Sequence, residues 1–174
     1  AWEAPQTTLE ILHYNVYQHN QEEKLAISGV CRENTNGKFF VHIPMIKGMK
    51  YDIVFWAEKE NNGFYSLDGK VLTINYDGAI ANDENRDAFL ATKTAFDPTS
   101  VTSPCIVELT RPFAQLNVAT SDYETIKDNG IILNADSDNN SSDLNITTEV
   151  DTKFNLFTNE VADGSVKQTV TFDA

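Results

Sequence analysis

The chain has 174 residues, of which 41% are hydrophobic, and its formal net charge is −13 at pH 7. This composition predicts one folded domain with a real core, covering residues 1–174, rather than a disordered chain. The acidic balance argues against nucleic acid and anionic membrane surfaces as partners, because both are bound through clustered Lys and Arg. No apolar run approaches the roughly 20 residues that a membrane-spanning helix needs.

Strand patterns begin near the start of the chain. Residues 8–18 (TLEILHYNVYQ) are rich in β-branched and aromatic residues, and residues 24–33 (KLAISGVCRE) form a weaker strand candidate. Apolar residues alternate with period 2 in residues 38–46 (KFFVHIPMI) and again in residues 49–59 (MKYDIVFWAEK). Because only a short turn separates these two runs, we expect them to pair as a hairpin.

The middle of the chain holds the only notable helix prediction. A short strand is expected at residues 70–76, and residues 81–96 (ANDENRDAFLATKTAF) follow it. Asn82 or Asp83 can cap a short helix there, and acidic residues crowd its first turn. Residues 122–130 could add one further helical turn.

A proline interrupts the next strand pattern, at residues 105–120 (CIVELTRPFAQLNVAT). Apolar residues occupy odd positions before Pro112 and even positions after it, so the inward phase shifts by one residue. A β-bulge at Arg111, Pro112 and Phe113 would absorb the extra residue and tolerate the proline. We therefore expect one long strand that bends at its middle.

The last part of the chain predicts three more short strands. They lie at residues 144–150, 152–158 and 166–172, after a polar loop at residues 134–143. The whole pattern gives about seven to nine strands and at most one or two short helices. Many short strands separated by turn residues indicate an all-β protein with a β-sandwich architecture.

No catalytic motif is present in the sequence. Cys31 and Cys105 lie outside any CxxC pair and away from histidine at metal-ligand spacing. Two buried thiols are the favoured interpretation of these cysteines, and a disulfide in an oxidising compartment is the alternative. His13, His19 and His42 belong to no zinc or hydrolase motif, and we interpret them as structural. These observations predict a protein that is not an enzyme and has no cofactor.

An acidic loop offers weak calcium candidates. Asp136, Asp138 and Asn140 stand at alternate positions, as at the start of a calcium-binding loop. The glycine that such a loop needs at its sixth position is Ser141, and the glutamate of its twelfth position is Thr147. We favour a solvated loop over a metal site.

Two further side chains have both a functional and a structural interpretation. Arg111 could bind a carboxylate or a sugar, but its place at the phase shift favours a structural ion pair with a nearby acidic residue. Trp56 and Phe55 could form a platform for a sugar ring. Aromatic residues at this spacing are more often part of a core, and we favour that interpretation.

Three motifs carry a resemblance to a known family. They are YDIVFWAEKENNGFYSLD at residues 51–68, ANDENRDAFLA at residues 81–91 and VELTRPFAQLNVAT at residues 107–120. In this order and spacing they resemble the amino-terminal domain of fimbrillin-like surface proteins of Bacteroidales bacteria. The resemblance covers residues 9–172, and the RPFAQLN block is its most specific part. The matching positions are Trp56, Asn82, Asp83, Asp87, Phe89, Arg111, Pro112 and Gln115.

The resemblance implies a transthyretin-like sandwich and a structural or adhesive role in type V pili. Such proteins are subunits, anchors or tips of fimbriae, and they are exported as lipoproteins to the outer membrane and cell surface. Their partners are other fimbrial subunits or ligands on host and bacterial surfaces, and stalk subunits join by adding a strand to a neighbour. The motif positions are expected to be fold determinants with no catalytic role.

Two features of the family are not visible in the sequence. We expect the lipid anchor that would attach the protein to the membrane, and the second sandwich domain of fimbrillins, to be missing from this chain. We therefore expect an excised amino-terminal domain or a short relative. The alternative function is a surface module that binds glycans. It would use Trp56 and the acidic loops, with calcium as a candidate for glycan binding.

Overall fold

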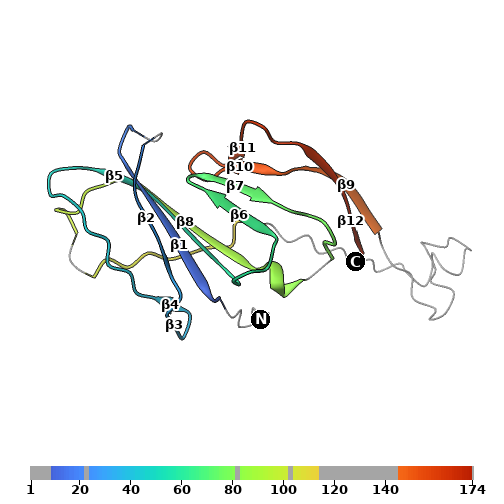
Figure 1. The fold of residues 1–174 in the computed structure, drawn as a ribbon, viewed down its shortest axis with the longest axis horizontal. Coiled ribbons are helices and arrows are strands. Elements are labelled where there is room, and N and C mark those ends of the chain that lie inside the picture. Colours follow the sequence, from blue (N-terminus) through green and yellow to red (C-terminus); the bar gives the residue numbers. More distant parts are fainter. Residues whose placement is uncertain (1–8, 22–23, 81–82, 102–103, 114–144, 174) are drawn as a thin grey trace, which may run out of the picture.

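A computed structural model describes residues 9–21, 24–80, 83–101, 104–113 and 145–173. The described residues are almost entirely β-strands, and every strand pairing is antiparallel, which confirms the predicted all-β class (Figure 1). Within these ranges, no helix has the length and apolar character to cross a membrane.

One four-stranded sheet organises the fold. Its strands are β2 (Leu25–Cys31), β1 (Ile11–Gln18), β5 (Tyr51–Glu58) and β8 (Ala88–Phe96), in that spatial order. We call it the central sheet. The expected first two strands are thus confirmed: β1 pairs with β5, and β2 pairs with the other edge of β1.

A second four-stranded sheet packs on one face of the central sheet. Its order is β11 (Glu160–Val161), β10 (Lys153–Asn155), β7 (Val71–Ile74) and β6 (Tyr65–Asp68). Two smaller pairs complete the described part of the fold. They are β9 (Asn145–Asp151) with β12 (Lys167–Asp173), and β3 (Asn34–Thr35) with β4 (Lys38–Phe39).

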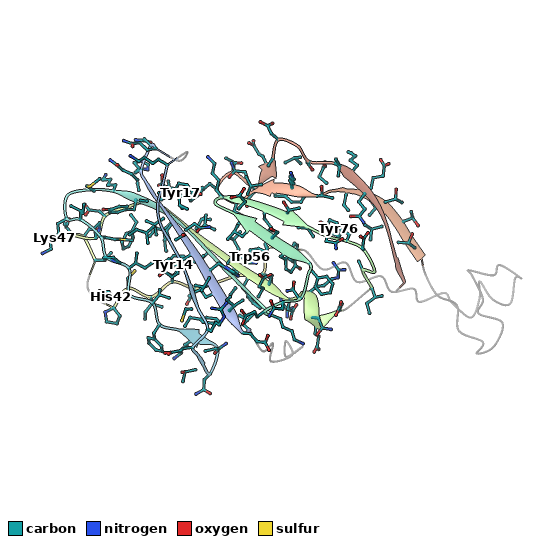
Figure 2. All side chains as sticks on the ribbon, in the orientation of Figure 1. Tyr14, Tyr17, His42, Lys47, Trp56 and Tyr76 are labelled. Atoms are coloured by element: carbon teal, nitrogen blue, oxygen red, sulfur yellow. The ribbon has the colours of Figure 1, made fainter. Side chains whose placement is uncertain are left out.

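Strand β5 is buried on both of its faces, from Tyr51 to Ala57. Alternate side chains enter two separate core clusters. Ile53 and Phe55 belong to the first, while Val54 and Trp56 belong to the second, between the two large sheets (Figure 2). Full burial of a large apolar side chain contributes about 1.5–3 kcal/mol, so the burial of this strand on both sides supplies much of the core's stability.

The first core cluster is covered largely by chain that lies outside the strands. Phe39, Val41, Ile43 and Met45 pack against the central sheet from one segment, and Val107 and Leu109 pack against it from another. Both segments follow the expected period-2 alternation of inward and outward side chains. The inward positions predicted for residues 38–46 and 105–109 are therefore confirmed.

The predicted hairpin of residues 38–46 with residues 49–59 is wrong. Only Lys38–Phe39 of the first run is a strand, and it pairs with β3. Both edges of β5 are occupied by β1 and β8, so no edge of β5 is left for the preceding run. Pro44 also has no N–H to donate to a ladder, which disfavours a regular strand at that position.

The predicted helix at residues 81–96 is also wrong. A short 3₁₀ helix covers Glu84–Arg86 only, with Asp83 at its N-cap as expected, and strand β8 follows. Residues of β8 alternate into both core clusters while they pair with β5. Pairing and burial at the central sheet therefore override the local helix signal.

The predicted long strand at residues 105–120 is not formed in its described half. Residues 105–109 belong to no strand, and an isolated bridge pairs Thr110 with Leu90 of β8. Arg111 and Pro112 follow this bridge directly, so the proline lies where ladder pairing has ended. The described residues do not include the second half of the predicted strand, from residue 114 on. They also do not include the predicted helical turn at residues 122–130.

Candidate functional site

An ion pair joins two of the sequence motifs. Arg111 Nη2 lies 2.6 Å from Asp87 Oδ2, with the side chains 32% and 18% exposed. The Arg111 guanidinium also lies 5.4 Å from the centre of the Phe89 ring. The structural interpretation of Arg111 is thus supported, with Asp87 as the acidic partner. The pair fixes the end of the segment 105–110 to the start of β8.

An aromatic cluster lies beside this ion pair. Phe113 stacks on Tyr65, with ring centres 5.8 Å apart, and both rings contact the edge or face of Trp56. Trp56 is fully buried, and its indole nitrogen has no hydrogen-bond partner in the described part of the chain. Among the described residues, only packing contacts hold the Trp56 side chain. The alternative of Trp56 and Phe55 as a sugar platform is wrong, because both side chains are buried.

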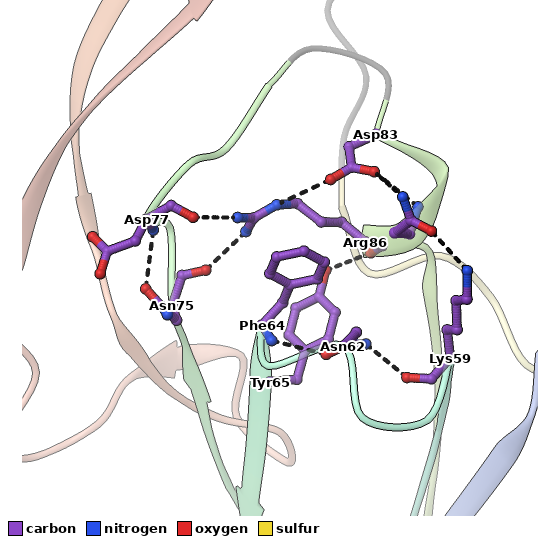
Figure 3. A network of polar contacts seen from close by, with 9 residues as sticks. Lys59, Asn62, Phe64, Tyr65, Asn75, Asp77, Asp83 and Arg86 are labelled. Carbon is purple, nitrogen blue, oxygen red and sulfur yellow. Dashed lines mark hydrogen bonds and ion pairs between the residues drawn. The ribbon is translucent and has the colours of Figure 1, made fainter.

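Arg86 connects three loops at the same end of the molecule (Figure 3). Its guanidinium donates hydrogen bonds to the backbone oxygens of Asn75 and Asp77, at 2.8 and 2.9 Å. The same group lies 3.8 Å from the centre of the Phe64 ring and 3.6 Å from Asp83 Oδ2. Four contacts of one partly buried cation with fixed partners favour a structural role over ligand binding.

Tyr65 adds a further link to this network. Its hydroxyl donates a hydrogen bond to the backbone oxygen of Arg86 (Figure 3). Burial raises the pKa of Tyr65 well above its ordinary value, with the Arg86 charge acting in the opposite direction. Since the raised pKa favours the protonated hydroxyl, it acts as a donor that joins β6 to the 3₁₀ helix.

The motif residues therefore gather at one end of the sandwich. Trp56, Asp83, Asp87, Phe89 and Arg111 all make packing or polar contacts there. Pro112 is exposed beside them. The described residues do not include the motif positions Asn82 and Gln115 or the calcium candidates Asp136, Asp138 and Asn140.

The two cysteines and the histidines His13 and His42 lie at partly or fully exposed positions. Both cysteines are free thiols, and the expectation of burial is wrong because Cys31 is half-buried and Cys105 is exposed. His13 contacts Glu58 at 3.4 Å, while His42 is exposed and points away from the sheet (Figure 2). In the described ranges, no cluster of three or more His, Cys, Asp or Glu side chains could hold a metal ion.

Sequence reasoning missed a buried carboxylate in β5. Asp52 is 1% exposed, and its Oδ1 lies 2.9 Å from His19 Nδ1. The same oxygen accepts the backbone N–H of Ala95 at 2.7 Å. Ala95 has φ +53, in a region that L-residues rarely adopt, and β8 bulges there. An acidic residue inside an otherwise apolar strand was the available signal.

The layer that covers the first core cluster has open backbone groups. We define the strap layer as residues 40–45 and 105–109 (teal and yellow in Figure 1). No backbone–backbone hydrogen bond involves these residues within the described part of the chain. Outward side chains of the layer include Phe40 and Ile106, which are 74% and 83% exposed. Within the described residues, the strap layer thus combines extended chain, N–H and C=O groups without backbone partners, and exposed apolar surface.

Fold and site together define an all-β protein whose motif residues stabilise its two layers. A family model described as "Family of unknown function (DUF6562)" matches residues 11–174, and the chain belongs to this family. No curated protein and no solved structure matches the chain significantly.

Proposed function

We propose that this chain is a non-enzymatic structural or adhesive protein of bacterial surface fimbriae, either a subunit or an anchor or tip protein. The three motifs that resemble fimbrillin-like proteins support this proposal. Their described residues contact one another and the core, as expected for determinants of a shared fold. We propose a transthyretin-like arrangement of the sandwich and an extracellular location from the same resemblance.

The observation that carries the proposal is the strap layer. Its two segments lie on the core as strands of a sandwich would, yet neither is paired along its backbone in the described ranges. An added strand can bond to such a layer through main-chain N–H and C=O groups. The strap layer is therefore where a neighbouring subunit would add a strand.

The partner strand is expected to be apolar on alternate residues. The outward Phe40 and Ile106 side chains provide exposed apolar surface for a partner to cover. Strand addition converts water-exposed backbone groups into hydrogen bonds and buries apolar area at the same time. This mode of association needs no charged contact, which suits a chain with a net charge of −13.

Assembly of the purified chain tests this proposal. Concentrated protein should form species of high molecular mass, seen by light scattering and negative-stain electron microscopy. His42→Pro and Glu108→Pro each remove one N–H from the strap layer at an exposed position. We expect both variants to assemble less than the unmodified chain while their thermal unfolding remains similar.

The alanine variants at the same positions are the matched controls. His42→Ala and Glu108→Ala remove the same side chains but keep the backbone donors, so they should assemble normally. A chain that stays monomeric under all conditions would contradict the proposal. Equal assembly of the proline and alanine variants would rule out the strap layer as the site.

A further inference from the structure

Strand β8 forms one edge of the central sheet, and its pairing with β5 is irregular near its end. The register of the two strands shifts by one residue between Tyr51 and Ile53. Asp52 therefore stands opposite two residues of β8, Thr94 and Ala95. Two residues that oppose one make a β-bulge, which bends the strand and interrupts the ladder.

The backbone of Ala95 needs support to hold this bulge. Its φ is +53, in the left-handed region that glycine adopts readily and that a Cβ atom disfavours. The Asp52 side chain supplies that support, because its Oδ1 accepts the Ala95 N–H at 2.7 Å. The bulge removes this N–H from the ladder, and the Asp52 oxygen satisfies it.

His19 holds the Asp52 side chain in place. The His19 Nδ1 lies 2.9 Å and 3.0 Å from the two oxygens of that side chain. The backbone N–H of His19 donates to the Lys50 oxygen at 2.9 Å, which fixes the chain just beyond β1. A carboxyl group that is 1% exposed is tolerated only where such polar partners surround it. We call Asp52, His19 and Ala95 the bulge group.

The core does not require the extra residue of β8. Phe89 and Ala91 pack on the first core cluster from odd positions, while Phe96 packs on it from an even position. The bulge thus compensates for the one residue that it adds. Deletion of Ala95 would leave these same three side chains facing the cluster from a regular strand. This leaves the outer edge of β8 as the place where the bulge has an effect.

The outer edge of β8 has backbone groups that another chain could pair with. Leu90 exchanges two backbone hydrogen bonds with Thr110, at 2.8 and 2.9 Å, so its N–H and C=O point away from β5. By the two-residue period of a strand, those of Thr92 point the same way. Within the described ranges, Thr92 has no backbone partner on that side. Lysine side chains and bulges keep such an edge from pairing, and the exposed Lys93 and the bulge follow Thr92 directly.

We propose that the bulge group closes the β8 edge of the central sheet to strands of other chains. A regular β8 would present a continuous edge from Thr92 to Phe96. The bulge bends that edge and turns the Ala95 N–H to Asp52, so an approaching strand meets an interrupted row of backbone partners. The proposal stands independently of the strap layer, because it concerns an edge that should remain unpaired.

Two glycine substitutions in β8 test the geometry of the bulge. Ala95→Gly should raise the equilibrium constant for folding about threefold, because glycine adopts the positive φ without the penalty of a Cβ atom. Ala91→Gly, in the regular part of the same strand, is the matched control and should lower that constant about threefold or more. Chemical denaturation measures both changes. A loss of stability in Ala95→Gly that equals the loss in Ala91→Gly would overturn the proposal.

A bulge-free variant tests the closure of the edge. It lacks Ala95 and carries Asp52→Val, because the carboxyl group then has no N–H to accept. Once circular dichroism and cooperative unfolding establish its fold, we expect it to self-associate about tenfold more tightly than the unmodified chain in analytical ultracentrifugation. Residues 92–94 should gain protection from amide exchange in the associated form. Asp52→Asn keeps an oxygen for the Ala95 N–H, so this matched control should associate like the unmodified chain. A folded bulge-free variant that associates no more than the unmodified chain would overturn the proposal.

Amide exchange in the unmodified chain tests the same closure without any variant, and it decides the question if the bulge-free variant does not fold. Residues 92–94 should exchange at the same rate in dilute and in concentrated protein, whether or not the strap layer becomes protected. Protection of the strap layer reports separately on the fimbrial proposal. Protection of residues 92–94 in concentrated unmodified protein would mean that the β8 edge is open, and it would overturn the closure.

Discussion

Arg111 Nη2 lies 2.6 Å from Asp87 Oδ2, and this contact joins segments that are 24 residues apart in the sequence. Asp87 immediately precedes β8, and Arg111 immediately follows the bridge of Thr110 to Leu90. The ion pair therefore closes the end of the strap layer onto the central sheet. It also brings two of the sequence motifs into direct contact.

Loss of this ion pair should destabilise the fold modestly. Because both side chains are partly exposed, we expect a coupling energy of about 1 kcal/mol between Arg111→Ala and Asp87→Ala. The measurement is a double-mutant cycle from urea unfolding of the two single variants and the double variant. Strictly additive effects of the two substitutions would show that Arg111 and Asp87 do not stabilise the fold as an ion pair.

Loss of the Asp52 carboxylate should be more severe. Asp52→Ala leaves the Ala95 N–H without its acceptor and removes the partner of His19, so we expect a loss of about 3 kcal/mol in the free energy of unfolding. Asp52→Asn keeps an oxygen that can accept from Ala95 and should lose less. Chemical denaturation compares the two variants, and a smaller loss for alanine than for asparagine would refute this role.

Gly69 in the turn between β6 and β7 is required for two reasons. Its φ of +59 is unfavourable for other residues, and an added Cβ would overlap the Tyr17 hydroxyl. Gly69→Ala should therefore destabilise the protein by about 2 kcal/mol. Gly63→Ala has a similar positive φ with open space around it, so it should cost only about 1 kcal/mol. Equal losses of stability would show that Tyr17 moves aside freely.

Alkaline pH should destabilise the fold through Tyr65. Burial raises the pKa of Tyr65 in the folded state above that of an unfolded chain, so the unfolded state loses its proton first. The contribution of Tyr65 is complete below about pH 10 and decreases as the pH rises above that value. We expect Tyr65→Phe to flatten the decline of thermal stability above pH 10. If thermal stability declines equally in Tyr65→Phe and in the unmodified chain, groups other than Tyr65 cause the decline.

The sequence predicted which side of each segment is buried better than it predicted pairing. Period-2 alternation correctly placed Val41, Ile43, Val107 and Leu109 on the core. Alternation does not distinguish a strand in a ladder from an extended strap, since both bury every second residue. The expected hairpin therefore failed although its inward residues were right.

Long-range contacts decided the features that local patterns missed. The run after Asp87 was predicted as helix, yet it became β8 because β5 offers a free edge and two core faces. The buried contact of Asp52 with His19 depends on a separation of 33 residues, which no local pattern contains. The sequence likewise predicted that Arg111 forms an ion pair, but it did not identify Asp87 as the acidic residue of that pair.

Amide hydrogen exchange in the strap layer tests the proposed mode of assembly most directly. Residues 40–45 and 105–109 should exchange rapidly in the isolated monomer, because their amides have no backbone partners in the described structure. Assembled protein should show strong protection at these residues, at a level that approaches that of β5. Assemblies in which both segments still exchange as fast as in the monomer would contradict strand addition at the strap layer.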